Sequence, residues 1–217
     1  MKAQRYARSA GSEGVKIKRF IFGAFETNTY VVSDAESVLL VDPACSNERE
    51  QAELLSYMQS PDMVHLPVRI IATHGHLDHL WGAAWACEQF STHVQMHPAD
   101  IPMAQAMQQQ YMLFGIRQRA VPFKTASLTE SIDRIQTGLH IIHTPGHTPG
   151  SVGLYWPEEN LLLSGDTLFR MGYGRTDLPG GNMGQLIESL ERLFTLPAET
   201  IVYPGHGEKT TIGDERR

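Results

Sequence analysis

The hydrophobic positions of the chain fall into two patterns, short apolar runs and repeats at helical spacing, which predict a mixture of strands and helices. The runs are rich in valine, isoleucine and aromatic residues and end at glycine, proline or aspartate, as is typical of strands. The first three follow one another closely and predict an antiparallel meander. Strands are expected over residues 16–22, 28–33, 37–41, 68–73, 94–97, 139–143, 152–156, 161–164 and 200–203.

Two helices are indicated by capping residues as well as by apolar spacing. Asn47, with Glu50 three residues later, forms a capping-box pattern and predicts a helix over residues 48–58. Asn182 precedes a stretch in which leucines recur at helical spacing, and the two features predict a helix over residues 183–194.

Two further helices are expected without clear caps. The helix over residues 80–90 carries Trp81 and Trp85, for which core packing is favoured over a substrate pocket. The helix over residues 98–114 is rich in methionine and glutamine and is interpreted as a packing face, with a flexible lid as the alternative. Residues 117–136 are mixed and polar and predict no regular element.

Composition places the chain among ordinary soluble globular enzymes. It has 217 residues, of which 41% are hydrophobic and 19% charged, as expected for one domain over residues 15–217. The net charge of −6 argues against a general attraction to nucleic acid. No apolar run reaches the length of about 18 residues that a membrane span requires. The partner expected from this composition is a small molecule, and the oligomeric state is left open.

The N-terminus and the cysteines bear on location. Residues 1–14 lack the apolar segment of a secretory signal and are expected to form a disordered tail. Cys45 and Cys87 are too few for a disulfide framework, and each is interpreted as a small buried apolar residue. A reducing, cytoplasmic location is therefore expected.

Four potential metal ligands follow the expected strand over residues 68–73 within six positions. His74 and His76 lie two residues apart in an extended loop, so their side chains can converge on one point. Asp78 and His79 are adjacent, diverge from that direction and can reach a second point nearby. Capping of the next helix by the aspartate is the simpler alternative. The density of ligand-type side chains favours metal binding.

Three more potential ligands lie directly after other expected strands, each in a glycine-containing turn. They are His147 in TPGHTPG, Asp166 in SGDT and His206 in PGHG. Strand ends at one edge of a sheet are where sites assemble in layered α/β folds, so these side chains are expected to join the first cluster. The remaining histidines occupy no such turn and are interpreted as ordinary: His65, His93, His97, His140 and His143.

These four motifs, in this order, resemble the metallo-β-lactamase superfamily over about residues 16–213. Within it the chain is most similar to glyoxalase II and the small glyoxalase II-like hydrolases, because GRTDLPGG at residues 174–181 is typical of that branch. The resemblance implies an α/β fold, the four-layer αβ/βα sandwich, with two metal ions at one edge. It also implies that the C-terminal helical domain with which full-length glyoxalase II binds glutathione is absent.

The resemblance implies a role for each residue. Asp78 and Asp166 are the expected catalytic residues, and Asp42 is expected to orient the ligand loop from behind. Arg175 takes the place of a lysine that contacts glutathione in glyoxalase II, and with Tyr173 it is the expected substrate-binding residue; pairing of Arg175 with Asp177 is the alternative. The implied ligands are His74, His76 and His147 for one metal, Asp78, His79 and His206 for the other, and Asp166 between them.

The implied activity is hydrolysis of small thioesters such as S-lactoylglutathione by two divalent transition metals. Zinc is expected, with iron or manganese as alternatives. Asp166 argues against β-lactam hydrolysis, because the β-lactamases of the superfamily have cysteine or serine there. A mononuclear-iron persulfide dioxygenase of the same fold and a lactonase are the alternative enzymes. A closed structural zinc site is disfavoured, since seven ligands for two metals leave room for water.

Overall fold

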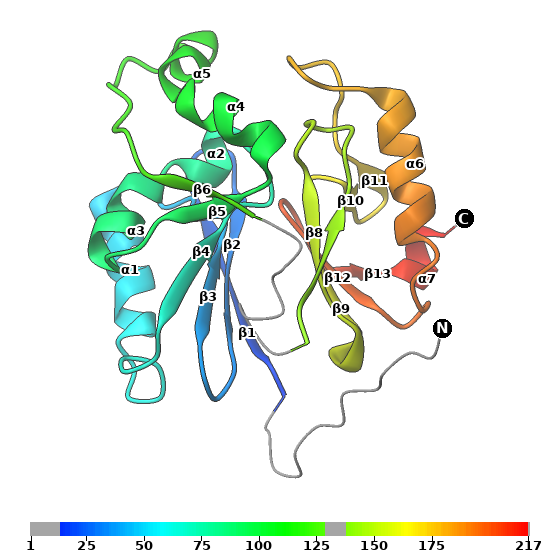
Figure 1. Cartoon of the computed structure of the whole chain (residues 1–217), viewed down its shortest axis with the longest axis horizontal. Helices are drawn as coiled ribbons and strands as arrows, with labels where there is room; N and C mark the ends of the chain where they lie inside the picture. Colours follow the sequence, from blue (N-terminus) through cyan, green and yellow to red (C-terminus); the bar gives the residue numbers. More distant parts are fainter. Residues whose placement is uncertain (1–13, 129–137, 217) are drawn as a thin grey trace.

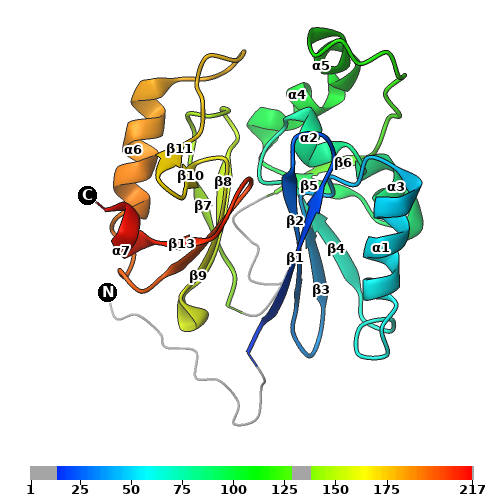
Figure 2. The same cartoon turned by 180° about the vertical axis from the view of Figure 1, so that it is seen from behind.

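Two β-sheets lie face to face, and helices cover the outer face of each (Figures 1 and 2). The structure is a computed structural model that describes residues 14–128 and 138–216. The arrangement confirms the predicted four-layer αβ/βα sandwich. Residues 1–13 of the expected tail, and residues 129–136 of the stretch for which no element was predicted, lie outside the described residues.

The first sheet has six strands in sequence order. Its first three strands form the predicted antiparallel meander, and from the third strand onward all neighbours are parallel. The last strand was not predicted, because its three residues, Thr-Ala-Ser, carry no apolar run. The strands are β1 (Lys16–Phe22), β2 (Thr27–Ser33), β3 (Val38–Val41), β4 (Val68–Ile71), β5 (Val94–Met96) and β6 (Thr125–Ser127).

The second sheet has five strands in the order β13-β12-β9-β8-β7. Strands β8 and β9 form the expected hairpin, which turns through the 3-10 helix η2 (Pro157–Glu159) and the left-handed Asn160. The sheet consists of β7 (His140–His143), β8 (Val152–Trp156), β9 (Leu161–Gly165), β12 (Ile201–Pro204) and β13 (Thr210–Thr211), and a separate ladder joins β10 (Leu168–Phe169) to β11 (Gly172–Tyr173).

Both capped helices form as predicted. The Asn47 side chain accepts a hydrogen bond from the Glu50 N–H at the start of α1 (Glu48–Met58). Asn182 caps α6 (Met183–Leu193) in the same way. Helices α1 and α3 (Ala83–Gln89) cover the first sheet, whereas α6 and α7 (Ile212–Glu215) cover the second (Figure 1).

The helix expected over residues 80–90 is wrong in its extent, because the structure has two helices there. The short helix α2 (Leu77–Leu80) ends before Gly82, and α3 begins after it. A Cβ at Gly82 would lie 2.3 Å from the Cys45 sulfur and 2.7 Å from the Cys45 carbonyl oxygen. The chain therefore passes so close to Cys45 that only glycine fits.

The helix expected over residues 98–114 is likewise divided. It consists of the 3-10 helix η1 (Pro98–Asp100), α4 (Ile101–Gln105) and α5 (Met107–Leu113). Met107 is buried in the core, as the packing interpretation requires, whereas Met112 is 71% exposed.

Three apolar clusters separate the four layers. Strand β3 shows that the first sheet contributes residues to two of these clusters. Val38 and Leu40 face the cluster beneath α1 and α3, whereas Leu39 and Val41 face the cluster between the sheets. A strand buried on both faces is a rigid support for the loop that follows it. In the described part of the chain, no helix is long and apolar enough to cross a membrane.

Candidate metal centre

The structure brings all seven predicted ligands to one edge of the sandwich. Asp78 and His79 lie in the first turn of α2, not ahead of it, and the N-cap position belongs to His76. The other ligands occupy the loops that end strands of both sheets: His74 and His76 follow β4, His147 follows β7, Asp166 follows β9 and His206 follows β12.

The ligand atoms form three overlapping groups, and within each group they lie within 4.8 Å of one another. In the first group the closest pair is His76 Nδ1 and His147 Nε2, 2.9 Å apart. In another group His206 Nε2 lies 3.1 Å from Asp78 Oδ2 and 3.3 Å from His79 Nε2. The groups are His74, His76 and His147; His74, His79 and Asp166; and Asp78, His79 and His206.

The Asp166 carboxylate lies between the histidines of the first and the third group. Its Oδ1 is 3.3 Å from His79 Nε2, and its Oδ2 is 3.5 Å from both His147 Nε2 and His206 Nε2. One carboxylate therefore has an oxygen near each of the two points on which the side chains converge.

The buried nitrogen of His74 tests whether these residues fit a metal ion. His74 is 1% exposed, and its Nε2 has no hydrogen-bond partner among the residues that the structure describes. A buried polar atom without a partner costs about 1–3 kcal/mol. A metal ion would satisfy this nitrogen together with those of His76 and His147, so the donor set fits a transition metal.

The ring nitrogens that face away from the cluster are held by oxygen atoms. Such partners fix the orientation of a ligating histidine and leave its other nitrogen free for a metal. They bond to the Nδ1 atoms of four histidines: Thr73 Oγ1 to His74 (3.1 Å), Asp42 Oδ2 to His79 (2.9 Å), the Arg175 carbonyl to His147 (2.7 Å) and the Phe25 carbonyl to His206 (3.0 Å).

Comparison with known proteins identifies the family. The family model of the metallo-beta-lactamase superfamily matches residues 22–206. The chain belongs to the metallo-β-lactamase superfamily.

Three proteins similar to this chain carry different descriptions within the superfamily. The hydroxyacylglutathione hydrolase GloC of Haemophilus influenzae is 32% identical, over 89% of this chain and 92% of that protein. The crystal structure of TTHA1623 in a di-iron-bound form is 36% identical with a TM-score of 0.81, covering 92% of this chain and 97% of that one. The BLEG-1 B3 metallo-β-lactamase is 32% identical with a TM-score of 0.78, covering 92% and 96%.

Asp42 supports the metallo-β-lactamase site from behind, at the end of β3. Its φ of 52° is left-handed, a conformation that aspartate tolerates better than most residues. One carboxylate oxygen accepts a hydrogen bond from the Thr73 N–H, and the other contacts the Thr73 hydroxyl and His79 Nδ1. Asp42 therefore contacts both the start of the ligand loop and one candidate ligand, and its orienting role stays a prediction.

The charges of the site are set by burial and by the carboxylates. Burial holds the pKa of His74 well below its usual value and lowers that of His76 to about 4, which leaves both rings neutral. Burial alone would lower the pKa of His79, but Asp166 and Asp78 outweigh it and hold that pKa well above its usual value. Burial would raise the pKa of both carboxyls, yet His79 keeps each below its usual range.

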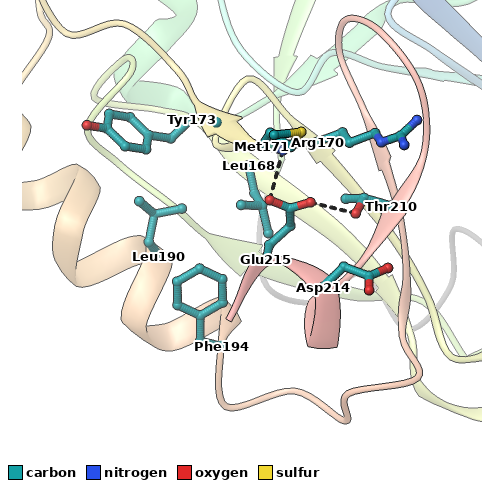
Figure 3. A pocket seen from close by; sticks show the side chains of 10 residues that line it. Leu168, Arg170, Met171, Tyr173, Leu190, Phe194, Thr210, Asp214 and Glu215 are labelled. Carbon is teal, nitrogen blue, oxygen red and sulfur yellow. Dashed lines mark hydrogen bonds between the residues drawn. The ribbon is translucent and has the colours of Figure 1, made fainter. Parts of the chain in front are cut away.

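The two expected substrate-binding residues occupy different surroundings. The exposed Arg175 guanidinium bonds to both oxygens of Asp177, at 2.7 and 2.6 Å, as the alternative interpretation predicts. The Tyr173 ring lines a cavity of about 650 Å³ together with Leu190 and Phe194 (Figure 3). None of the seven candidate ligands lines this cavity.

An aromatic group beside His206 was not predicted. The Phe25 ring lies 5.6 Å from that of Phe114 and 6.2 Å from that of Trp81, and the Phe169 ring is 6.2 Å from the His206 ring. No sequence signal marks Phe25, because it lies in the short turn between β1 and β2.

Proposed function

We propose that the protein is a metal-dependent hydrolase that uses two divalent metal ions to cleave small thioesters, glutathione thioesters such as S-lactoylglutathione among them. The observation that carries this proposal is the pair of three-residue ligand groups with the Asp166 carboxylate between them. The likeness to the hydroxyacylglutathione hydrolase GloC supports the thioester class.

The first group, His74, His76 and His147, would hold one ion, and Asp78, His79 and His206 the other, with Asp166 shared. Bound divalent metals would supply Lewis acidity and water of lowered pKa. Zinc is the ion we expect, with iron or manganese as alternatives.

Asp78 is the chain's candidate proton acceptor. Its pKa lies below the usual range, so the carboxylate is ionised at neutral pH. The Thr27 hydroxyl donates to its Oδ2 at 3.1 Å and fixes its direction. A thiolate leaves without prior protonation, so a site whose carboxylates are ionised suits a thioester.

One observation favours a second candidate, a persulfide dioxygenase with a single iron. The group of His74, His79 and Asp166 offers two histidines and one carboxylate, the ligand set typical of non-haem iron oxygenases. Metal stoichiometry separates the candidates, because the hydrolase requires two ions per chain and the dioxygenase one.

The test combines metal analysis with three substrates. The protein is loaded with zinc, iron(II) or manganese(II) and assayed with S-lactoylglutathione, with glutathione persulfide under oxygen, and with a cephalosporin. We expect two metals per chain and thioester hydrolysis that falls at least about 10²-fold in Asp166→Asn, with loss of metal. One iron per chain with oxygen consumption, or β-lactam cleavage without thioester cleavage, would refute the proposal.

A further inference from the structure

Asp100 is a buried carboxylate outside the ligand groups. It ends η1, just after strand β5, and is 0% exposed. A carboxylate buried this completely is retained only where donors satisfy its oxygens.

The donors to Asp100 come from two different ligand loops. Its Oδ2 accepts hydrogen bonds from the Gly75 N–H at 2.8 Å and from the Thr148 hydroxyl at 2.6 Å. Its Oδ1 accepts a hydrogen bond from the Gly150 N–H at 2.6 Å. Gly75 lies between His74 and His76, and Thr148 directly follows His147, so one carboxylate ties together the loops of the first ligand group.

The two loops also close tightly around Asp100. A Cβ at Gly150 would lie 2.6 Å from the carboxylate carbon, and one at Gly75 would lie 3.0 Å from the Asp100 carbonyl oxygen. Gly150 therefore admits its N–H at hydrogen-bond distance because it lacks a side chain, and a side chain at Gly75 would be tightly packed against Asp100.

We propose that Asp100 is a positioning residue that holds the two loops of the first ligand group, His74, His76 and His147, in register for one metal ion. The inference rests on the proposed metal centre and adds a residue to it. The hydrogen bonds of the Asp100 carboxylate reach only the two loops of the first group among the described residues, whereas His79 of the second ligand group is held by Asp42. The effect of Asp100 is therefore selective for one of the two sites.

The substitution Asp100→Asn tests this selectivity with little change of volume. An amide has one acceptor oxygen, whereas Gly75 and Gly150 donate to opposite oxygens of the carboxylate. Whichever way the amide turns, its NH₂ group faces one backbone N–H, and one ligand loop loses a hydrogen bond that holds it.

Two single-site backgrounds separate the metal sites. His206→Ala leaves the first group intact, and His147→Ala leaves the second group intact. Cobalt(II) affinity is measured in each by competition with a chelator, alongside the visible cobalt spectrum. We expect Asp100→Asn to weaken binding about 10–100-fold in the His206→Ala background. In the His147→Ala background we expect a change of less than about threefold.

Thr148→Val is a milder companion variant, because it removes one of the three donors and keeps the carboxylate. It should weaken cobalt binding in the His206→Ala background alone. If Asp100→Asn does not fold, this variant tests the role of Asp100 in its place. Equal losses in both backgrounds, or no loss in either, would overturn the role of Asp100. If cobalt binding is lost selectively but the protein cleaves no thioester, the role of Asp100 stands and the thioester proposal is refuted. If neither background binds cobalt, the role of Asp100 and the proposed metal centre are both overturned.

Discussion

Gly205 offers a way to displace candidate metal ligands without removing any. It directly precedes His206 at the end of β12, and a Cβ there would lie 2.1 Å from Asp166 Oδ1 and 2.7 Å from His79 Cε1. Its φ is not positive, so alanine meets no backbone penalty and the effect of Gly205→Ala is steric.

The size of the effect follows from these distances. Real Cβ atoms essentially never lie within 3.0 Å of such a neighbour, so the Asp166 oxygen at 2.1 Å has to move by about 0.9 Å. Metal–ligand distances tolerate about 0.2 Å. A misplacement of about 1 Å at a catalytic centre costs about 10²-fold in rate, or about 2.7 kcal/mol of transition-state stabilisation. We expect Gly205→Ala to lose metal during dialysis and to lose about 10²-fold in kcat/KM for a thioester.

Gly207→Ala is the matched control. No atom of the described residues lies within 4 Å of a Cβ at Gly207, but its φ of 73° imposes a strain of about 1–2 kcal/mol on alanine. This control should lower the melting temperature and retain its metal. Metal content by mass spectrometry, with a melting curve of the metal-free protein, distinguishes the two variants. Wild-type metal content and activity in Gly205→Ala, or equal metal loss in Gly207→Ala, would contradict the reasoning.

Two further predictions concern Arg175 and Cys45. Because Arg175 forms an exposed pair with Asp177, Arg175→Ala should leave the midpoint of a denaturant titration almost unchanged. If Arg175 binds substrate, its loss should raise KM for glutathione thioesters and spare a thioester without carboxylates; equal losses would place it outside the binding site. Burial raises the pKa of the Cys45 thiol to about 12, so iodoacetamide should label it at pH 8 far more slowly in the native than in the urea-unfolded protein, and equal rates would contradict its burial.

Local patterns predicted the long elements well, because each carries its own signal. The caps of α1 and α6 are contacts within four residues, and the strands beneath the ligand loops are apolar runs bounded by turn residues. The break at Gly82 could not be predicted in this way, because the Gly82 N–H there donates to the Pro43 carbonyl of another loop, a contact that exists only in the folded protein. Strands β10, β11 and β13 have two residues each, too few to show an alternating pattern.

The same distinction holds within the site. The candidate ligands could be predicted because they follow strands closely in sequence, in loops or, for Asp78 and His79, in the first turn of α2, and their motifs are contiguous. Asp100 also follows a parallel strand, and the strand-end rule that selected His147 could have selected it. Phe25 could not be found, because its contact with His206 joins the first and second sheets and exists only in the folded protein.

The site straddles the junction of the two halves of the sandwich, and backbone hydrogen bonds cross that junction on both sides of it. On one side the Val152 N–H donates to the Thr73 carbonyl at 2.9 Å, next to His74. On the other the Asn28 N–H donates to the Gly205 carbonyl at 2.7 Å, next to His206. These bonds fix the ligand loops of one sheet against those of the other, so ligand geometry is held by the protein backbone itself. A preorganised site of this kind responds sharply to displacements below 1 Å, which is why a single methyl group at Gly205 is expected to be as damaging as a lost ligand.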